Sequence, residues 1–393
     1  MKRLLTISVN SLIFSFIPIL IYFCLGLLVD KDLVNVFSIT YPLQFIYSLL
    51  RSIFATGANI SKEKDNDNNA VLSGMTLGIL VGFIVFGIFV LNVDKYISFM
   101  NMDYNVYVEF TIYSIIQLYI SAVFSFVLEK LYFEDKEKLA NKYCIQMNMI
   151  NFISLVISSI IFKNKWCIVS ITLLSIFIYV LIVTIKQYRK FKFKIHILKY
   201  IKYESVEIIN NLLFFFFYLF GLSNTSEFGN EYILALNFVT LLTDCQWDTF
   251  DAIITVAKID IAQKNFDYKT HIKNSYKLLF ILFSTIIIMF LITYKFYNPN
   301  LILVCIYLGF DFINFLMYPI YSINTCYLQL ESSTVKITFN KLVTSILRFI
   351  LSLLKTPFCT GIGQTVSSIY QYISTSIMIK KQCRNINSST KNN

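Results

Sequence analysis

Long apolar stretches, each separated from the next by a short polar segment, follow one another along the chain. Each is about 20 residues or longer, the length that an α-helix needs to cross the bilayer core. The pattern predicts an all-α integral membrane protein with about twelve transmembrane helices, at residues 4–29, 34–57, 70–93, 104–133, 143–162, 166–185, 206–223, 231–257, 275–297, 300–328, 334–354 and 360–379.

The eighth stretch is the least apolar, because it contains three aspartates in the segment DCQWDTFDAI, which begins at Asp244. Two basic segments flank this stretch, at residues 186–202 and 258–277. Lys and Arg gather in short cytoplasmic loops, so the helices after both segments should enter the membrane from the cytoplasm. A crossing must lie between them, and only residues 231–257 can supply it.

Composition and charge agree with this topology. The chain is 56% apolar and 15% charged, whereas a soluble domain carries about 25% charged residues. The net charge of +11 is spread over short loops rather than gathered in one patch, which argues against a nucleic-acid partner. With both termini cytoplasmic, 25 Lys and Arg residues fall on the inner side and 6 on the outer side. We therefore expect a multi-pass protein of the cytoplasmic membrane.

The basic segment at 186–202 divides the predicted helices into two sets of six. Shifting PLQFIYSLLRSIFATGANISKEKD by 202 residues places Gln44 on Gln246 and Asp65 on Asp267. This faint similarity predicts two six-helix pseudo-repeats at 1–185 and 206–380, a basic linker at 186–205 and a polar tail at 381–393. Substrate sites of transporters tend to lie where such repeats meet.

Polar side chains form one stripe on the eighth predicted helix. At 100° per residue, a single face carries Asn237, Thr240, Asp244, Asp248, Asp251, Thr255 and Lys258. An acid at the bilayer centre costs about 2.5–3.5 kcal/mol on insertion scales, so these aspartates must face water, a cation or each other. We expect a proton or a sodium ion at Asp244 and Asp248. The alternative is that the helix ends early and the acids, Asp251 above all, lie at the interface.

The tenth predicted helix has a second polar stripe that contains one carboxylate, at Asp311, Asn314, Tyr318, Ser322 and Thr325. We expect Asp311 and Asn314 to help line the site. Glu207 opens the seventh helix, where an acid also suits a helix N-terminus. Gln246 is the repeat partner of Gln44, and Trp247 could stack on an organic cation, although a tryptophan in such a helix is more often a packing residue.

The sequence contains no signature of an enzyme. It has no nucleophile elbow, Walker motif or zinc signature, and its eight cysteines are far apart. We expect no cofactor. The remaining functions are ion-coupled transport, flipping, and a passive or receptor-like role.

Several segments resemble the multidrug and toxin extrusion (MATE) family, within the multidrug/oligosaccharidyl-lipid/polysaccharide flippase superfamily. Residues 41–74 resemble its second helix and the loop after it, EKLYFEDKEKLANKYCIQMNMIN resembles its fourth and fifth helices, and residues 234–266 resemble its eighth. The resemblance implies two six-helix halves and cation-coupled export. One branch of the family carries an acid in helix one, where this chain has none before Asp30; the other uses acids in helices seven and ten, for which Glu207 and Asp311 are the nearest matches.

The sequence thus predicts a monomeric secondary antiporter, in which sodium or proton entry drives export of a small organic, cationic substrate by alternating access. Two alternatives stay open. A lipid-linked oligosaccharide or polysaccharide flippase would show basic cavity residues, for which Arg51, Lys341 and Arg348 are candidates near helix ends. A non-transporting membrane sensor would need no ion-linked stripe.

Overall fold

A computed structural model of the chain describes residues 4, 20–21, 23–30, 33, 35–64, 66–67, 69–134, 136–188, 197–262, 266–331 and 334–389. Within these ranges it describes all side chains except those of residues 38, 60, 63–64, 132, 137, 202–207, 244–246, 248–252, 255, 258–262, 292, 296, 329–331, 334–335 and 383–389.

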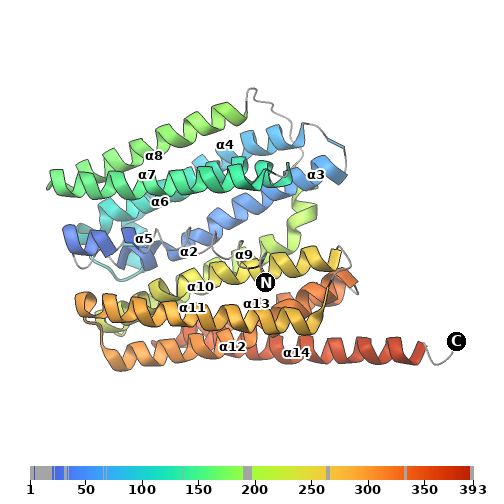
Figure 1. The fold of residues 1–393 in the computed structure, drawn as a ribbon. Coiled ribbons are helices and arrows are strands. Elements are labelled where there is room, and N and C mark those ends of the chain that lie inside the picture. The colour runs from blue at the N-terminus through green and yellow to red at the C-terminus, as the bar shows by residue number, and fades with distance from the viewer. Residues whose placement is uncertain are drawn as a thin grey trace. The chain divides into compact units, whose positions relative to one another are not determined.

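The described part of the chain is helical and contains no β-strand (Figure 1). Residues 20, 21 and 23–28 are helical inside the first predicted stretch, and every later predicted stretch coincides with a helix. The helices are α2 (Asn35–Leu50), η2 (Arg51–Gly57), α3 (Ala58–Lys64), α4 (Ala70–Leu91), α5 (Val93–Phe99), α6 (Tyr104–Phe133), α7 (Glu137–Ile161), α8 (Lys165–Gln187), α9 (Ile197–Ser226), α10 (Asn230–Ala262), α11 (Tyr268–Tyr297), α12 (Leu301–Glu331), α13 (Thr334–Ser352) and α14 (Cys359–Ser389).

Seven of the described helical segments are long and apolar enough to cross a membrane, at Ala70–Leu91, Tyr104–Leu131, Lys138–Ile161, Lys165–Gln187, Ile208–Ser226, Tyr268–Lys295 and Leu301–Leu328. Many large apolar side chains on these helices are exposed, among them Phe83, Ile160 and Phe280. Such a surface suits contact with lipid, not with water. The prediction of a helical, multi-pass membrane protein is confirmed.

The chain forms two compact units. The N-terminal unit comprises Phe16–Glu227, and the C-terminal unit comprises Phe228–Asn393 together with Met1–Ser15. This division falls after α9, not within the predicted linker at 186–205, because α9 packs on α2 and η2. The two pseudo-repeats were inferred from sequence symmetry, and they stay a prediction.

Within the N-terminal unit, α2, η2 and α3 form one helical run from Asn35 to Lys64, in which η2 is a π-helix. Glycines of α4 pack closely on this π-helical turn and on α6. A Cβ on Gly74 would lie 2.5 Å from the carbonyl oxygen of Phe54, and one on Gly78 would lie 2.3 Å from the ring of Phe126. A larger residue at either position would therefore force the helices apart.

Within the C-terminal unit, α10 and α12 run side by side in the same direction. Near their first residues, the Asn300 amide donates to Glu231 at 3.3 Å, and farther along, Cys326 Sγ approaches the Ile254 carbonyl oxygen at 3.9 Å. Their interface belongs to a core that also draws on α11 and on Leu4. This pairing determines which residues of α10 and α12 lie opposite one another.

Candidate functional site

The acidic segment is part of one continuous helix. Residues 244–253 lie inside α10, which runs without a break from Asn230 to Ala262. The side chains of Asp244, Gln246, Asp248 and Asp251 lie outside the described part of the structure, as does that of Glu207 on α9. Their roles as ion or substrate ligands stay predictions.

A described polar cluster joins α10 to α12 beside this segment. The Thr243 hydroxyl donates a hydrogen bond of 2.9 Å to Asp311 Oδ2. Thr243 is only 1% exposed. It lies about 20 Å along α10 from Asn230, and Asp311 lies about 15 Å along α12 from Leu301, at a rise of 1.5 Å per residue. A membrane span that begins at Leu301 would place Asp311 near its middle, since the hydrocarbon core is about 30 Å thick.

Asn314 provides the second feature of this cluster. It lies three residues after Asp311, on the same side of α12, and its side chain is fully buried. Neither its amide oxygen nor its amide nitrogen has a hydrogen-bond partner in the described part of the protein. An unpaired buried polar group costs about 1–3 kcal/mol, so a bound ion or water that satisfied this amide would be favoured. Asn237, on α10, is also buried.

The polar stripe predicted on the tenth helix lies on α12, and its role in a site stays a prediction. Asn314, Tyr318, Ser322 and Thr325 are all buried, and Asp311 is partly exposed. Thr243 was missed, because it lies 100° around the helix from Asp244 and a single threonine carries no hydropathy signal. Its helical position next to the acidic stripe was the only available indication.

Trp247 packs in the core of the C-terminal unit. Its ring centroid lies 5.1 Å from that of Phe315 and 5.5 Å from that of Tyr318. These contacts support the packing interpretation over stacking on a substrate cation.

A second buried polar cluster lies in the N-terminal unit. The Tyr113 hydroxyl donates to Asn151 Oδ1 at 2.6 Å, and the Asn151 Nδ2 group has no partner among the described residues. One turn before Tyr113, the Oε2 atom of Glu109 is buried and without a described partner. Tyr113 and Asn151 are 38 residues apart, so no local pattern in the sequence marks them as a pair.

Two of the three candidate cations for an anionic substrate, Arg51 and Arg348, have described partners. Arg51 lies in the middle of the helical run 35–64, not near a helix end, and forms an ion pair with Glu129 of α6, whose carboxylate its Nε reaches at 2.8 Å. Arg348 is 7% exposed and donates from Nε to Ser367 Oγ at 3.0 Å. Both residues therefore join helices within one unit.

Two further observations concern ligands. No group of three or more His, Cys, Asp or Glu side chains with metal-binding geometry occurs among the described residues. A groove between α7 and α8, lined by isoleucines and by Ser154, Ser158 and Ser175, contains none of the predicted site residues. Its lining is apolar and uncharged, as expected for a surface in contact with lipid.

The helices, their order and their exposed apolar faces define a multi-pass helical membrane protein. No protein-family model and no curated protein sequence matches this chain significantly. Solved structures do match over nearly the whole chain. A MATE in a bent conformation matches with a TM-score of 0.66 and 15% identity, covering 98% of this chain and 96% of that one. The inward-facing conformation of a multidrug resistance MATE family transporter matches with a TM-score of 0.67 and 12% identity, covering 98% and 99%.

A MOP superfamily transporter from Pyrococcus furiosus Vc1 also matches, with a TM-score of 0.70 and 13% identity over 96% of each chain. The reverse polarity of that transporter's binding pocket suggests a different function for it. The protein has the fold of the MATE transporters of the MOP superfamily. The resemblance inferred from the sequence is thereby confirmed at the level of the fold.

Proposed function

We propose that the protein is a secondary active transporter that exports a small organic cation in exchange for sodium ions or protons. The observation that carries this proposal is the Thr243–Asp311–Asn314 cluster near mid-depth of α10 and α12, within a MATE fold. An acid inside a membrane helix is costly and is usually retained for function. We also propose that the protein acts as a monomer and has no enzymatic activity.

The proposed topology has twelve crossings in two pseudo-repeats of six, with both termini in the cytoplasm. The strong excess of Lys and Arg in alternate loops supports it. The two halves would expose the site alternately to either side of the membrane, as in other transporters built from repeats.

In the proposed mechanism, Asp311 binds the coupling ion through its carboxylate. Thr243 holds that carboxylate in place, and the Asn314 amide oxygen supplies a further ligand, since hard cations prefer oxygen. Asp244 follows Thr243 on α10, and we propose that it binds the ion or the cationic substrate together with Asp248. Ion and substrate then compete for the same negative charge, which couples their movements.

The test is uptake of a fluorescent organic cation into vesicles under an imposed sodium gradient or an imposed proton gradient. We expect Asp311→Asn to abolish gradient-driven transport. Asp103→Asn is a matched control, because Asp103 is an exposed acid whose contact with the Asn105 backbone N–H an amide oxygen can replace. If Asp311→Asn transports as well as Asp103→Asn does, the proposed site is wrong.

A flippase for anionic lipid-linked sugars is less well supported. It would need cationic side chains free to bind the substrate, and Arg51 and Arg348 are engaged by Glu129 and Ser367. No observation on the described residues favours a sensor over a transporter.

A further inference from the structure

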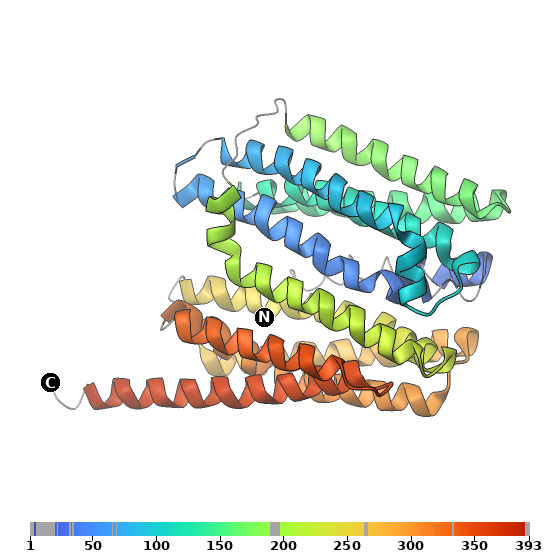
Figure 2. The same ribbon diagram turned by 180° about the vertical axis from the view of Figure 1, so that it is seen from behind.

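Helices α7 and α8 form an antiparallel pair that is joined by residues 162–164 (Figures 1 and 2). Within the N-terminal unit, α6 packs on both helices. Each helix of the pair is long and apolar enough to cross a membrane, and both carry large exposed apolar side chains, among them Ile160 and Ile182. The pair therefore has a surface that suits contact with lipid.

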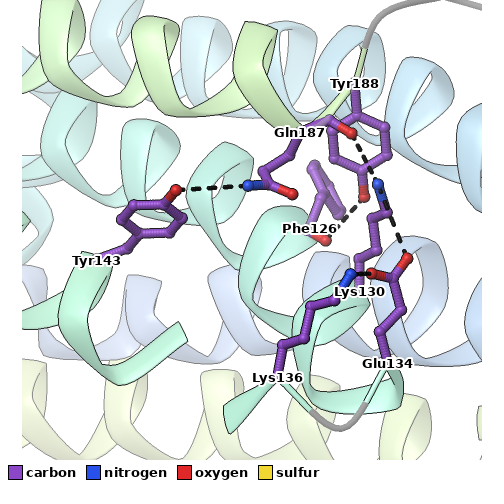
Figure 3. A network of polar contacts seen from close by, with 7 residues as sticks. All are labelled: Phe126, Lys130, Glu134, Lys136, Tyr143, Gln187 and Tyr188. Carbon is purple, nitrogen blue, oxygen red and sulfur yellow. Dashed lines mark hydrogen bonds and ion pairs between the residues drawn. The ribbon is translucent and has the colours of Figure 1, made fainter. Parts of the chain in front are cut away.

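Polar contacts hold the two helices together at the end that is far from this turn. The Gln187 side-chain amide donates to the Tyr143 hydroxyl at 3.5 Å (Figure 3), and the Tyr179 hydroxyl donates to the Tyr143 carbonyl oxygen at 3.0 Å. Just after α8, the Tyr188 hydroxyl donates to the Phe126 carbonyl oxygen of α6 at 3.0 Å. Side chains of the protein itself therefore fix this end of the pair.

An ion-pair network around Lys130 of α6 supports the same end. Lys130 Nζ donates a hydrogen bond of 2.7 Å to the Gln187 carbonyl oxygen and lies 4.7 Å from the centroid of the Tyr188 ring. Glu134 lies 3.9 Å from Lys130 and accepts a hydrogen bond of 2.8 Å from Lys136 (Figure 3). This end of α7 and α8 is thus closed by contacts within the N-terminal unit.

The end of the pair near the turn is built differently, since a groove lies between the two helices there. This α7–α8 groove has a volume of about 400 Å³, which lies within the range of about 300–1,000 Å³ of small-molecule sites. Its lining contains five isoleucines, Phe162 and the small residues Ser154, Ser158 and Ser175. The serines leave room between the helices that larger side chains would fill.

The hydroxyl groups of these serines already have partners. Ser154 Oγ donates to the Asn151 carbonyl oxygen at 3.1 Å, Ser158 Oγ to that of Leu155 at 3.0 Å, and Ser175 Oγ to that of Ile171 at 2.9 Å. A polar occupant would therefore gain few hydrogen bonds in exchange for those that it loses on entering the groove. A hydrocarbon chain loses none, so the lining suits hydrocarbon.

The length of the groove matches one leaflet of a bilayer. From Ile150 to Phe162 the groove follows α7 for about 18 Å, at a rise of 1.5 Å per residue. Half of a hydrocarbon core of about 30 Å is about 15 Å. A transmembrane helix of a second copy would cross both leaflets and would meet the end that Tyr143 and Tyr179 close. One acyl chain fits the groove without extending beyond it.

Two lysines and a tryptophan lie where the groove meets the turn. Lys163 directly follows the lining and is exposed, and Lys165 Nζ donates to the Val106 carbonyl oxygen at 3.3 Å. Trp166 is 45% exposed, as is common for a tryptophan at a membrane surface. The sequence contains no Asp or Glu from residue 138 to residue 203. A phosphate group is complementary to the positive charge at this end of the groove.

We propose that the α7–α8 groove binds one acyl chain of an anionic phospholipid and that Lys163 binds its phosphate. The acyl chain fills the space that the serines leave, and the lipid thereby holds this end of the pair together as Tyr143 and Tyr188 hold the other end. Lysines near a membrane surface attract anionic lipid headgroups. In the proposed topology the lipid belongs to the outer leaflet. The inference concerns α7 and α8 alone, so its test stands whether or not the protein transports a cation.

Native mass spectrometry of the purified protein tests the proposal. In mild detergent with added phosphatidylglycerol, we expect one lipid to stay bound at a collision energy that removes all others. Phosphatidylcholine, added at the same concentration, should be retained several-fold less. Equal retention of the two lipids overturns the role of Lys163, and the loss of every bound lipid at one common energy overturns the site.

Two pairs of variants locate the lipid. Ser175→Phe fills the groove from a partly exposed position of α8 and should abolish retention, whereas Ser170→Phe, at an exposed position of α8 outside the lining, is the matched control and should keep it. Lys163→Gln should lower the retention of phosphatidylglycerol several-fold, and Lys95→Gln, which removes an exposed lysine of α5, should leave it unchanged. If Ser175→Phe retains the lipid as the wild type does, the proposal is wrong.

Cross-linking identifies the occupant directly. Phosphatidylglycerol with a photoactivatable diazirine in its acyl chain should label peptides that contain Ile153 or Ile171 in the wild type and not in Ser175→Phe. The same labelling in both proteins would contradict the proposal. A wild-type dimer that Ser175→Phe converts to monomers would overturn it in favour of a second copy of the chain as the occupant. Should Ser175→Phe fail to fold, Ser154→Leu fills the same groove from α7 and takes its place in each test.

Discussion

The Thr243 hydroxyl donates a hydrogen bond of 2.9 Å to Asp311 Oδ2, so that a side chain of α10 holds a carboxylate of α12. Because the two helices run in the same direction, this contact fixes their register at the depth where the acid lies. Ligands on the two helices then keep a constant separation. An ion site built on rigid helices is more precise than one built on loops.

Thr243→Val should weaken ion coupling with little change in shape. Valine has nearly the same volume but removes the hydroxyl that donates to the Asp311 carboxylate. The loss of a hydrogen bond to a buried polar group costs about 1–3 kcal/mol, and about 1.4 kcal/mol corresponds to a tenfold change in an equilibrium constant. We expect the ion concentration for half-maximal transport to change by about tenfold, measured in vesicles over a series of gradients.

Thr243→Ser keeps the hydroxyl and is the matched control. It should transport with an ion dependence close to that of the wild type. Equal ion dependence in Thr243→Val and wild type would show that this hydrogen bond does not serve the coupling ion.

Asn314→Leu should separate stability from function. Replacing a buried amide that lacks partners by an apolar side chain of similar size removes an unfavourable desolvation term of about 1–3 kcal/mol. We expect a higher melting temperature in detergent together with loss of ion-coupled transport. A variant that melts lower than the wild type would indicate that a bound ion or water satisfies the amide in the resting protein; one that transports normally would exclude Asn314 from the site.

The sequence predicted the helices well, because the thickness of the bilayer imposes one length on every apolar stretch. It also predicted a helix with a polar stripe at α12, since Asp311 and Asn314 stand out against apolar neighbours at helical spacing. Residues 244–253 lie within one unbroken helix, whereas the membrane crossing that loop charge requires there stays a prediction. These features depend on local composition alone.

Contacts between distant helices could not be predicted. Glu129 and Arg51 are 78 residues apart, and nothing in either segment marks the other as its partner. The attachment of α9 to α2 depends on ring stacking between Phe45 and Phe214, in a chain with 38 phenylalanines. Composition cannot distinguish such a contact from a lipid-facing ring.

Glu129→Gln should destabilise the N-terminal unit. It leaves Arg51 without its charged partner, and a hydrogen bond between charged groups contributes about 1.5–3 kcal/mol. We expect a lower melting temperature. The double variant Arg51→Gln, Glu129→Gln should recover most of the loss, since neither charge then remains unpaired. A double variant that loses as much stability as Arg51→Gln and Glu129→Gln combined would contradict the pairing.

Trp247→Ala should mainly lower the stability of the protein rather than its affinity for the substrate. Truncating a large aromatic residue in a packed core costs about 3–5 kcal/mol, and Trp247 contacts Phe315 and Tyr318. Trp247→Phe should restore most of the stability. An organic-cation affinity that falls in both variants while their melting temperatures stay equal to the wild type's would instead identify Trp247 as a substrate ligand.

Protonation of Glu134 should make the N-terminal unit less stable in acid. Its pKa is lowered in the folded protein, as the hydrogen bond from Lys136 and the three neighbouring lysine charges prevail over partial burial. A depressed pKa means that the carboxylate contributes stability above its ordinary pKa of 4.5 and loses that contribution as the pH falls through the folded value. The contribution is small, about 0.2–1 kcal/mol, as for other partly exposed ion pairs.

We expect the wild type to melt higher than Glu134→Gln at neutral pH, with the difference shrinking as the pH is lowered from about 5 to 3. Lys136→Met should reduce the same difference at neutral pH. A difference that grows on acidification would mean that Glu134 is stabilised in its protonated form, contrary to the network around Lys130.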